Sequence, residues 1–184
     1  MNIVLIGFRG TGKSTIGKLL ASHLKMDFID TDEYITNSTG KTIKEIFLER
    51  GEEGFRTIEA AAVAIVSRMD NQIIAAGGGV ILNNKNVVNL KSNGTLILLN
   101  ATPEVIHNRL SLDKKTADQR PSLTGKEAFE EIRHLIQKRA PLYDNAADHA
   151  INTSHKSKED IVLEIVMFME GLHGDEKDEE PHGN

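Results

Sequence analysis

Short apolar runs alternate along the chain with segments in which hydrophobic residues recur every three or four positions. Five runs are bounded by turn residues: NIVLIG (2–7), FID (28–30), QIIAA (72–76), TLILLN (95–100) and, more weakly, HAIN (149–152). Uninterrupted apolar runs of this length are typical of parallel strands that are covered on both faces. Between the runs, positions such as Ile16, Leu20 and Leu24 have the spacing of one face of a helix.

The expected helix starts carry capping signals. Capping-box or cap-proline spacing occurs at Thr42 with Glu45, Thr124 with Glu127, Ser157 with Asp160, and Thr102 before Pro103. Strands that alternate with helices predict an α/β fold, a three-layer sandwich around a central five-stranded parallel sheet with right-handed crossovers. No internal repeat interrupts this pattern.

Composition adds the expectation of one domain and a tail. The 184 residues, 39% of them hydrophobic, suffice for one continuous core, which we expect over residues 1–170. Residues 171–184 contain five acids and one lysine, a net −4, so the rest of the chain carries only −1 of the total −5. We expect this tail to be disordered, with an interaction role as the alternative.

These properties argue against several function classes. A nearly neutral body is not typical of a nucleic-acid-binding surface. The chain has no cysteine, so neither disulfides nor thiolate chemistry is available. The N-terminal IVLIG run is too short for a secretion signal, and no run is long enough to span a membrane. We therefore expect a cytoplasmic protein without nucleic-acid or membrane partners. We also expect a monomer.

The most specific motif is GFRGTGKS (7–14), which fits G-x-x-x-x-G-K-[ST] between an expected strand and an expected helix. Glycines let the backbone N–H groups of such a loop turn toward a phosphate. Lys13 can reach the β- and γ-phosphates of a nucleoside triphosphate, and the Ser14 hydroxyl can bind Mg²⁺. We expect ATP contacts from Gly10, Thr11, Gly12, Lys13, Ser14 and Thr15, the last as a helix residue with a secondary polar contact.

Two aspartates follow the second apolar run. A nucleoside triphosphate site needs a carboxylate on the metal side, commonly at the end of a neighbouring strand. FID is the only clear run after the first that ends in an acid, so elimination selects Asp30, with Ser14, for Mg²⁺. Asp32 could then orient and deprotonate an acceptor hydroxyl, although a cap for the following helix is an equal alternative.

Other segments suggest the acceptor side. Arg56 in GFRTIE, Arg120 in DQRPSL and Arg139 in KRAPLY stand in distinctive surroundings, although each also suits an exposed face or loop. The polar segment at about 112–124 has the character of a mobile lid or of an ordinary surface loop. GGGV (77–80) is either a simple turn or a place where four unobstructed backbone N–H groups meet a small polyol.

The motifs GFRGTGKST, FIDTD, FRTIE, AAGGGV, RPSL and RAPLY resemble, in order and spacing, those of the shikimate kinases, which are P-loop enzymes related to nucleoside monophosphate kinases. The resemblance covers about residues 1–170. It implies a P-loop kinase fold with a mobile lid. It also implies ATP- and Mg²⁺-dependent phosphorylation of the 3-hydroxyl of shikimate, giving shikimate 3-phosphate and ADP in chorismate biosynthesis.

The resemblance implies roles for individual residues. Asp32 matches the residue that contacts the acceptor hydroxyl and serves as its base, while Asp30 matches the metal-side acid. Lys13 and the lid residue Arg120 match residues that meet the transferring phosphate. The implied shikimate-binding residues are Asp32, Arg56, Gly77, Gly78, Gly79 and Arg139, and two arginines suit a carboxylate-bearing acceptor.

Further matches surround this set. Phe47 and Phe55 match apolar walls of the acid site, although a core role predicts the same residues. Glu59 is expected to brace Arg56, and Arg109 is the nearest candidate for an adenine contact. In the lid, Ser122 stands where the family has leucine, and the loop between Arg109 and Arg120 is longer than in many relatives.

Three alternatives stay open at this point. A related kinase would act on gluconate or a nucleotide, but Arg56 with Arg139 favours a carboxylate acceptor. A GTPase switch would need N-K-x-D and D-x-x-G motifs, and the chain has neither. A non-catalytic ATP-binding module is disfavoured by Asp30, Asp32 and Arg120.

Overall fold

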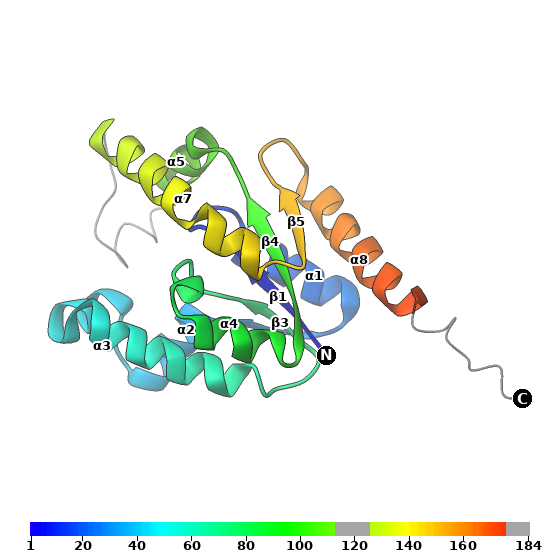
Figure 1. Cartoon of the computed structure of the whole chain (residues 1–184), viewed down its shortest axis with the longest axis horizontal. Coiled ribbons are helices and arrows are strands. Elements are labelled where there is room, and N and C mark those ends of the chain that lie inside the picture. The colour runs from blue at the N-terminus through cyan, green and yellow to red at the C-terminus, as the bar shows by residue number, and fades with distance from the viewer. Residues whose placement is uncertain (113–125, 176–184) are drawn as a thin grey trace, which may run out of the picture.

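The computed structural model describes residues 1–112 and 126–175 and shows a parallel sheet between two layers of helices (Figure 1). The strands are β1 (Asn2–Ile6), β2 (Asp27–Asp30), β3 (Gln72–Ala75), β4 (Gly94–Asn100) and β5 (His149–Asn152), in the order β2-β3-β1-β4-β5. All four pairings are parallel, with Ile3 of β1 beside Ile73 and Thr95. The expected α/β class with a five-stranded parallel sheet is confirmed.

Helices connect the strands. They are α1 (Lys13–Leu24), α2 (Thr31–Thr39), α3 (Ile43–Val66), the short 3-10 helix η1 (Val80–Leu82), α4 (Asn84–Lys91), α5 (Pro103–Leu112), α7 (Lys126–Ala146) and α8 (Lys158–Asp175). Gly51, with φ 67°, bends α3 within its length. The expected lid at about 112–124 lies, apart from Leu112, outside the described residues.

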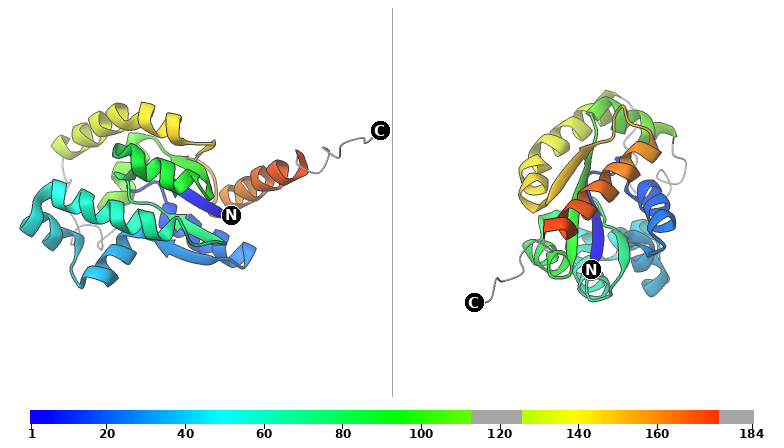
Figure 2. Two further views of the ribbon diagram at one scale, coloured as in Figure 1. Left: turned by 60° about the horizontal axis from the view of Figure 1, so that its bottom comes forward. Right: turned by 90° about the vertical axis from the view of Figure 1, so that its right-hand side faces the viewer.

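The side chains of β1 show how both faces of the sheet are covered. Ile3 and Leu5 pack with residues of α1 and α8, whereas Val4 and Ile6 pack with residues of α3, α4 and α7. Successive side chains of a strand point to opposite faces, so a continuous apolar run is what two helical layers require. In the right panel of Figure 2, β1 separates α7 from α1.

Several expected helix starts are confirmed. Thr42 and Glu45 form a full capping box at α3. Before α8, the Ser157 hydroxyl accepts a hydrogen bond from the backbone N–H of Asp160 at 3.0 Å. Pro103 opens α5, as expected from its place after Thr102. The capping box expected at Thr124 and Glu127 involves residues or side chains outside the part of the chain that the structure describes.

The last helix extends beyond its expected end. α8 continues through Gly171 to Asp175, although the sequence predicts a tail from 171 onward, because buried Ile165 and Met169 anchor its later turns to the core. Residues 176–184 lie outside the description, so a disordered tail stays a prediction. Among the described helices, none has the length and apolar character needed to cross a bilayer.

Candidate active site

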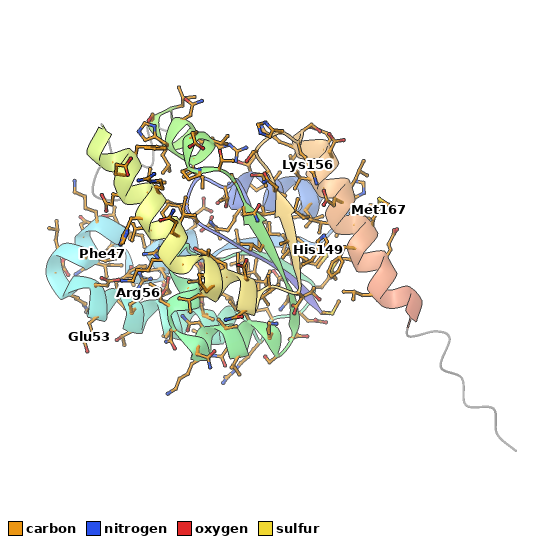
Figure 3. All side chains as sticks on the ribbon, turned by 45° about the horizontal axis from the view of Figure 1, so that its top comes forward. Phe47, Glu53, Arg56, His149, Lys156 and Met167 are labelled. Atoms are coloured by element: carbon orange, nitrogen blue, oxygen red, sulfur yellow. The ribbon has the colours of Figure 1, made fainter. Side chains whose placement is uncertain are left out.

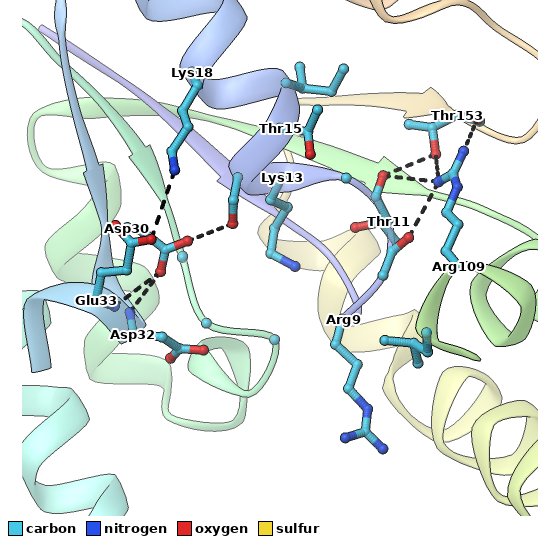
Figure 4. A pocket seen from close by; sticks show the side chains of 18 of the residues that line it. Arg9, Thr11, Lys13, Thr15, Lys18, Asp30, Asp32, Glu33, Arg109 and Thr153 are labelled. Carbon is cyan, nitrogen blue, oxygen red and sulfur yellow. Dashed lines mark hydrogen bonds and ion pairs between the residues drawn. The ribbon is translucent and has the colours of Figure 1, made fainter. Parts of the chain in front are cut away.

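A cleft of about 610 Å³ opens where the carboxyl ends of β1, β2 and β3 meet (Figure 4). Open parallel sheets bind ligands at this edge, and the volume suits a small molecule. Among the residues that line the cleft are the predicted Gly10, Thr11, Gly12, Lys13, Ser14, Thr15, Asp30, Asp32, Gly77, Gly78 and Arg109. Arg56, Gly79 and Arg139 do not line it; they adjoin it through the glycine turn at 77–79.

The P-loop between β1 and α1 depends on its glycines. Gly10 and Gly12 have φ values of 81° and 102°, in the left-handed region that side chains disfavour. The largely buried Lys13 ammonium donates to the carbonyl oxygens of Gly7 (2.8 Å) and Phe8 (2.9 Å). Because α1 begins at Lys13, the N–H groups of its first turn are available to a phosphate.

The two carboxylate oxygens of Asp30 have separate partners. Oδ1 accepts from the backbone N–H groups of Asp32 (2.9 Å) and Glu33 (3.4 Å) and so caps α2. Oδ2 accepts from the Ser14 hydroxyl at 2.6 Å. The interpretation of Asp32 as the helix cap is therefore wrong, because α2 begins at Thr31 and Asp32 already lies in its first turn.

The pair formed by Ser14 and Asp30 fits a magnesium ion. Mg²⁺ commonly takes one or two oxygen ligands from a protein and completes its shell with water and phosphate. In the part of the chain that the structure covers, no group of three or more His, Asp and Glu side chains is placed to hold a metal. The donor set is thus suited to an ion that arrives with a nucleotide.

The acceptor side is built around the turn that follows β3. A Cβ atom on Gly77 would lie 2.8 Å from Oδ1 of Asp32 and 3.2 Å from Oε1 of Glu59. A Cβ atom on Gly79 would lie only 2.3 Å from a guanidinium nitrogen of Arg56. The missing side chains therefore allow α2, α3 and the turn to meet, which brings Asp32 and Arg56 together around one short segment.

Part of the turn's backbone is already engaged. The Gly77 N–H donates to the Thr31 hydroxyl at 2.9 Å, and the Val80 N–H donates to the Gly77 carbonyl at 3.0 Å. The expectation of four N–H groups open to a polyol is wrong for these two, because they stabilise the turn itself. Of the four, only those of Gly78 and Gly79 remain as candidates.

Arg56 is held by acids on its own helix. Its guanidinium contacts the buried Glu59 at 2.9 Å and the exposed Glu52 at 3.2 Å, so the expected brace by Glu59 is present. Burial lowers the pKa of Arg56, but the charges and hydrogen bonds of Glu59 and Glu52 outweigh it and raise the pKa above its usual value. The guanidinium is therefore a permanent, oriented cation.

Aromatic rings pack beside Arg56. Phe47 and Phe55 stack with ring centroids 4.7 Å apart, and the Arg56 guanidinium lies 5.3 Å from the Phe55 centroid (Figure 3 labels Phe47 and Arg56). Phe55 is only 1% exposed and belongs to a core cluster between α2 and α3. Phe55 is thus primarily a core residue, whereas the partly buried Phe47 remains the better candidate for an apolar wall.

Arg139 approaches the same turn from α7. Its guanidinium donates to the Gly78 carbonyl at 3.3 Å and lies 5.7 Å from the centroid of Phe8. The hydroxyl of Tyr143, one turn later on α7, donates to the same carbonyl at 2.6 Å. Arg56 and Arg139 therefore adjoin neighbouring residues of one glycine turn.

Arg109 is anchored to the back of the P-loop. It donates to the carbonyls of Gly10 (3.3 Å) and Thr11 (3.4 Å), and to the hydroxyl and carbonyl of Thr153 (3.0 and 2.8 Å). Its position in the cleft wall is compatible with a nucleotide contact, but its contacts here are structural. Arg120 lies outside the described residues.

Sequence reasoning missed several residues of the site. Thr31, Tyr143 and Thr153 have single hydroxyls that join segments far apart in the chain, and no local pattern marks them. Arg9 and Lys156 line the cleft as well. Arg9 lies inside the P-loop motif, and this position could have indicated that it lines the cleft.

A P-loop at the end of β1, an acid at the end of β2 and an arginine-flanked turn after β3 define a P-loop kinase of the small-molecule type. Residues 9–170 match the model of the shikimate kinase family. The chain belongs to the shikimate kinase family.

Similar proteins align with nearly the whole chain. A shikimate kinase of Caldanaerobacter subterraneus subsp. tengcongensis is 47% identical, with 94% of this chain and 98% of that protein covered. One of Rhodopirellula baltica is 42% identical, covering 90% and 88%. The solved structure of an Acinetobacter baumannii shikimate kinase in complex with shikimate has a TM-score of 0.86 at 32% identity and covers 93% of both chains.

Proposed function

We propose that this chain transfers the γ-phosphoryl group of ATP to the 3-hydroxyl of shikimate, producing shikimate 3-phosphate and ADP in chorismate biosynthesis. Membership of the shikimate kinase family supports this reaction. The observation that carries the proposal is the glycine turn, which gathers Asp32 and Arg56 at its edge while Gly77 and Gly78 line the P-loop cleft. A phosphate donor and a carboxylate-bearing polyol would thus meet across one short segment.

The phosphate side would bind and orient the nucleotide. Lys13 would exchange the carbonyls of Gly7 and Phe8 for the β- and γ-phosphates, while the N–H groups at the start of α1 receive their oxygens. Ser14 and Asp30 would hold Mg²⁺, which neutralises phosphate charge when bound. Gly10 to Gly12 and Thr15 complete the proposed ATP contacts, with Arg109 on the adenine side.

The acceptor side would hold shikimate and take its proton. Arg56 and Arg139 present guanidinium donors suited to a carboxylate. Asp32, beside Gly77, would accept the proton of the 3-hydroxyl as its oxygen attacks the γ-phosphorus in line and the bond to the leaving ADP oxygen breaks. The contribution of Arg120 to the transferring phosphate stays a prediction.

The test is ADP release at fixed Mg·ATP with and without acceptor. We expect release with shikimate and almost none with its methyl ester, which lacks the carboxylate charge. Release with gluconate or a nucleoside monophosphate in place of shikimate would assign a different small-molecule kinase. ATP binding without release for any of these acceptors would indicate a non-catalytic module.

Three further expectations accompany this function: a Mg²⁺ requirement, a monomeric state and a cytoplasmic location. Titration of Mg²⁺ against turnover tests the first, and light scattering of the purified chain tests the second. Cell fractionation tests the third.

A further inference from the structure

Two buried hydroxyl groups, one on α2 and one on α7, bond to the glycine turn. The Thr31 hydroxyl accepts from the Gly77 N–H at 2.9 Å, and the Tyr143 hydroxyl donates to the Gly78 carbonyl at 2.6 Å. Thr31 is 0% exposed and Tyr143 is 5% exposed, so water does not readily replace either bond. Both residues belong to helices that also carry a proposed acceptor residue.

We propose that Thr31 and Tyr143 are positioning residues that align Asp32 and Arg139, respectively, with the acceptor. This inference rests on the proposed function. The two residues are expected to act on different steps: Thr31 positions Asp32, which takes the proton, whereas Tyr143 positions Arg139, which binds the acceptor.

The Thr31 contact lies directly beside Asp32. Thr31 is the first residue of α2 and Asp32 the second, and Asp30 caps this end of the helix. The glycine turn is close-packed against α2, since a Cβ on Gly77 would lie 2.8 Å from Oδ1 of Asp32. A shift of Gly77 relative to α2 therefore moves the Asp32 carboxylate relative to the acceptor, and small misplacements of a catalytic group have large effects on rate.

The Tyr143 contact lies one turn beyond Arg139. Residues four positions apart share one face of a helix, and here both donate to the Gly78 carbonyl, Arg139 at 3.3 Å and Tyr143 at 2.6 Å. The shorter bond fixes the distance between α7 and the turn, so the guanidinium keeps its place. Without the phenol oxygen, α7 loses its closest polar contact with the turn among the described residues.

The turn has little room to adjust on its third side. A Cβ on Gly78 would lie 3.1 Å from the backbone nitrogen of Arg9 in the P-loop. The backbone of the turn thus lies close to the P-loop backbone on the nucleotide side. Loss of either hydroxyl would instead loosen the turn on the acceptor side, which predicts an effect on shikimate rather than on ATP.

The experiment compares Thr31→Val and Tyr143→Phe with their matched controls. Thr31→Ser restores the hydroxyl, while Thr57→Val and Tyr34→Phe make the same chemical changes on α3 and α2 at hydroxyls that, among the described residues, do not bond to the turn. We expect Thr31→Val to lower kcat about tenfold and Tyr143→Phe to raise the KM for shikimate about tenfold, with the KM for ATP unchanged. Thr31→Ser should recover most of the lost kcat.

Several results would overturn the proposal. These are unchanged kcat and shikimate KM in both variants, equal rises in the KM values of ATP and shikimate, or a Thr31→Ser variant that behaves like Thr31→Val. If thermal melting shows that Thr31→Val does not fold, Tyr143→Phe decides, and an unchanged shikimate KM rejects the inference. A wild-type chain without shikimate-dependent ADP release would instead contradict the proposed function.

Discussion

The cleft has a phosphate half, formed by the P-loop at residues 7–14, and an acceptor half, formed by the glycine turn at 77–79 and the helices that meet it. The two halves are built in different ways. In the phosphate half, Lys13 bonds to carbonyls of its own loop, six and five residues earlier in the chain. In the acceptor half, α2, α3 and α7 meet the turn after β3, and the Thr31–Gly77 bond joins residues 46 positions apart. The Lys13 contacts of the first half are local, although Arg109 and Thr153 also bond to its loop carbonyls from far along the chain. The glycine turn of the second half meets its helices only when the sheet has formed.

This difference predicts how each half responds to amino-acid substitutions. A contiguous loop depends mainly on its glycines and its strand, with Arg109 and Thr153 as anchors from outside the loop. A composite pocket depends on the distances between helices, so each contact can be altered separately. The following predictions test whether the halves are functionally separable.

Lys13→Met should break the phosphate half. Removing a cation aimed at the transferring phosphate is expected to lower kcat by about 10³-fold, the upper range for loss of one electrostatic donor. ADP-release kinetics would measure it, with Lys44→Met, an exposed position on α3, as the control. Turnover close to that of the wild type would show that the lysine does not serve the reaction.

Asp32→Asn should break the acceptor half and spare the nucleotide. The amide keeps the size of the side chain but cannot take the proton, so we expect kcat to fall by about 10²-fold. Calorimetric titration with a non-hydrolysable ATP analogue should give the wild-type affinity. Asp27→Asn at the other end of β2 is the matched control. Normal turnover in Asp32→Asn would remove its role as base.

Asp30→Asn probes the boundary between the halves. Asparagine caps a helix as well as aspartate does, so α2 should remain in place. The lost charge beside Ser14 is expected to raise the Mg²⁺ concentration required for half-maximal turnover by about 10-fold or more. An unaltered Mg²⁺ titration would refute the metal-side assignment.

Arg56→Lys should give the smallest of the four effects. Lysine keeps the charge but not the planar pair of donors, so the KM for shikimate is expected to rise about tenfold with little change for ATP. Steady-state kinetics in both substrates would measure the split. Arg50→Lys on the exposed face of α3 controls for the chemical change. Parallel increases in both KM values would indicate general damage instead.

Much of the architecture was predictable because it follows from local patterns. The five apolar runs became the five strands, and the P-loop lies where its motif requires. Asp30 was selected by elimination among strand ends, and its contact with Ser14 agrees with that choice. The equal alternative for Asp32 failed because a cap is set by where the first helical N–H groups point, which two nearby aspartates do not reveal.

Other features could not be read from the sequence. Hydroxyls such as those of Thr31, Tyr143 and Thr153 join distant segments, and any threonine or tyrosine has the same chemistry until a partner is near. The GGGV segment was ambiguous for the same reason. Only its neighbours show that Thr31 and Gly77 engage two of its N–H groups.

The sequence alone determined the strands, the loop for phosphate and the residue types of a kinase site, because strand periodicity and P-loop geometry are properties of contiguous residues. The tertiary structure decided which acid caps α2, which N–H groups of the glycine turn remain available and which contacts hold Arg56 and Arg139 beside it. Those outcomes depend on distances between helices that lie far apart in the chain and are brought together by packing on the two faces of one sheet.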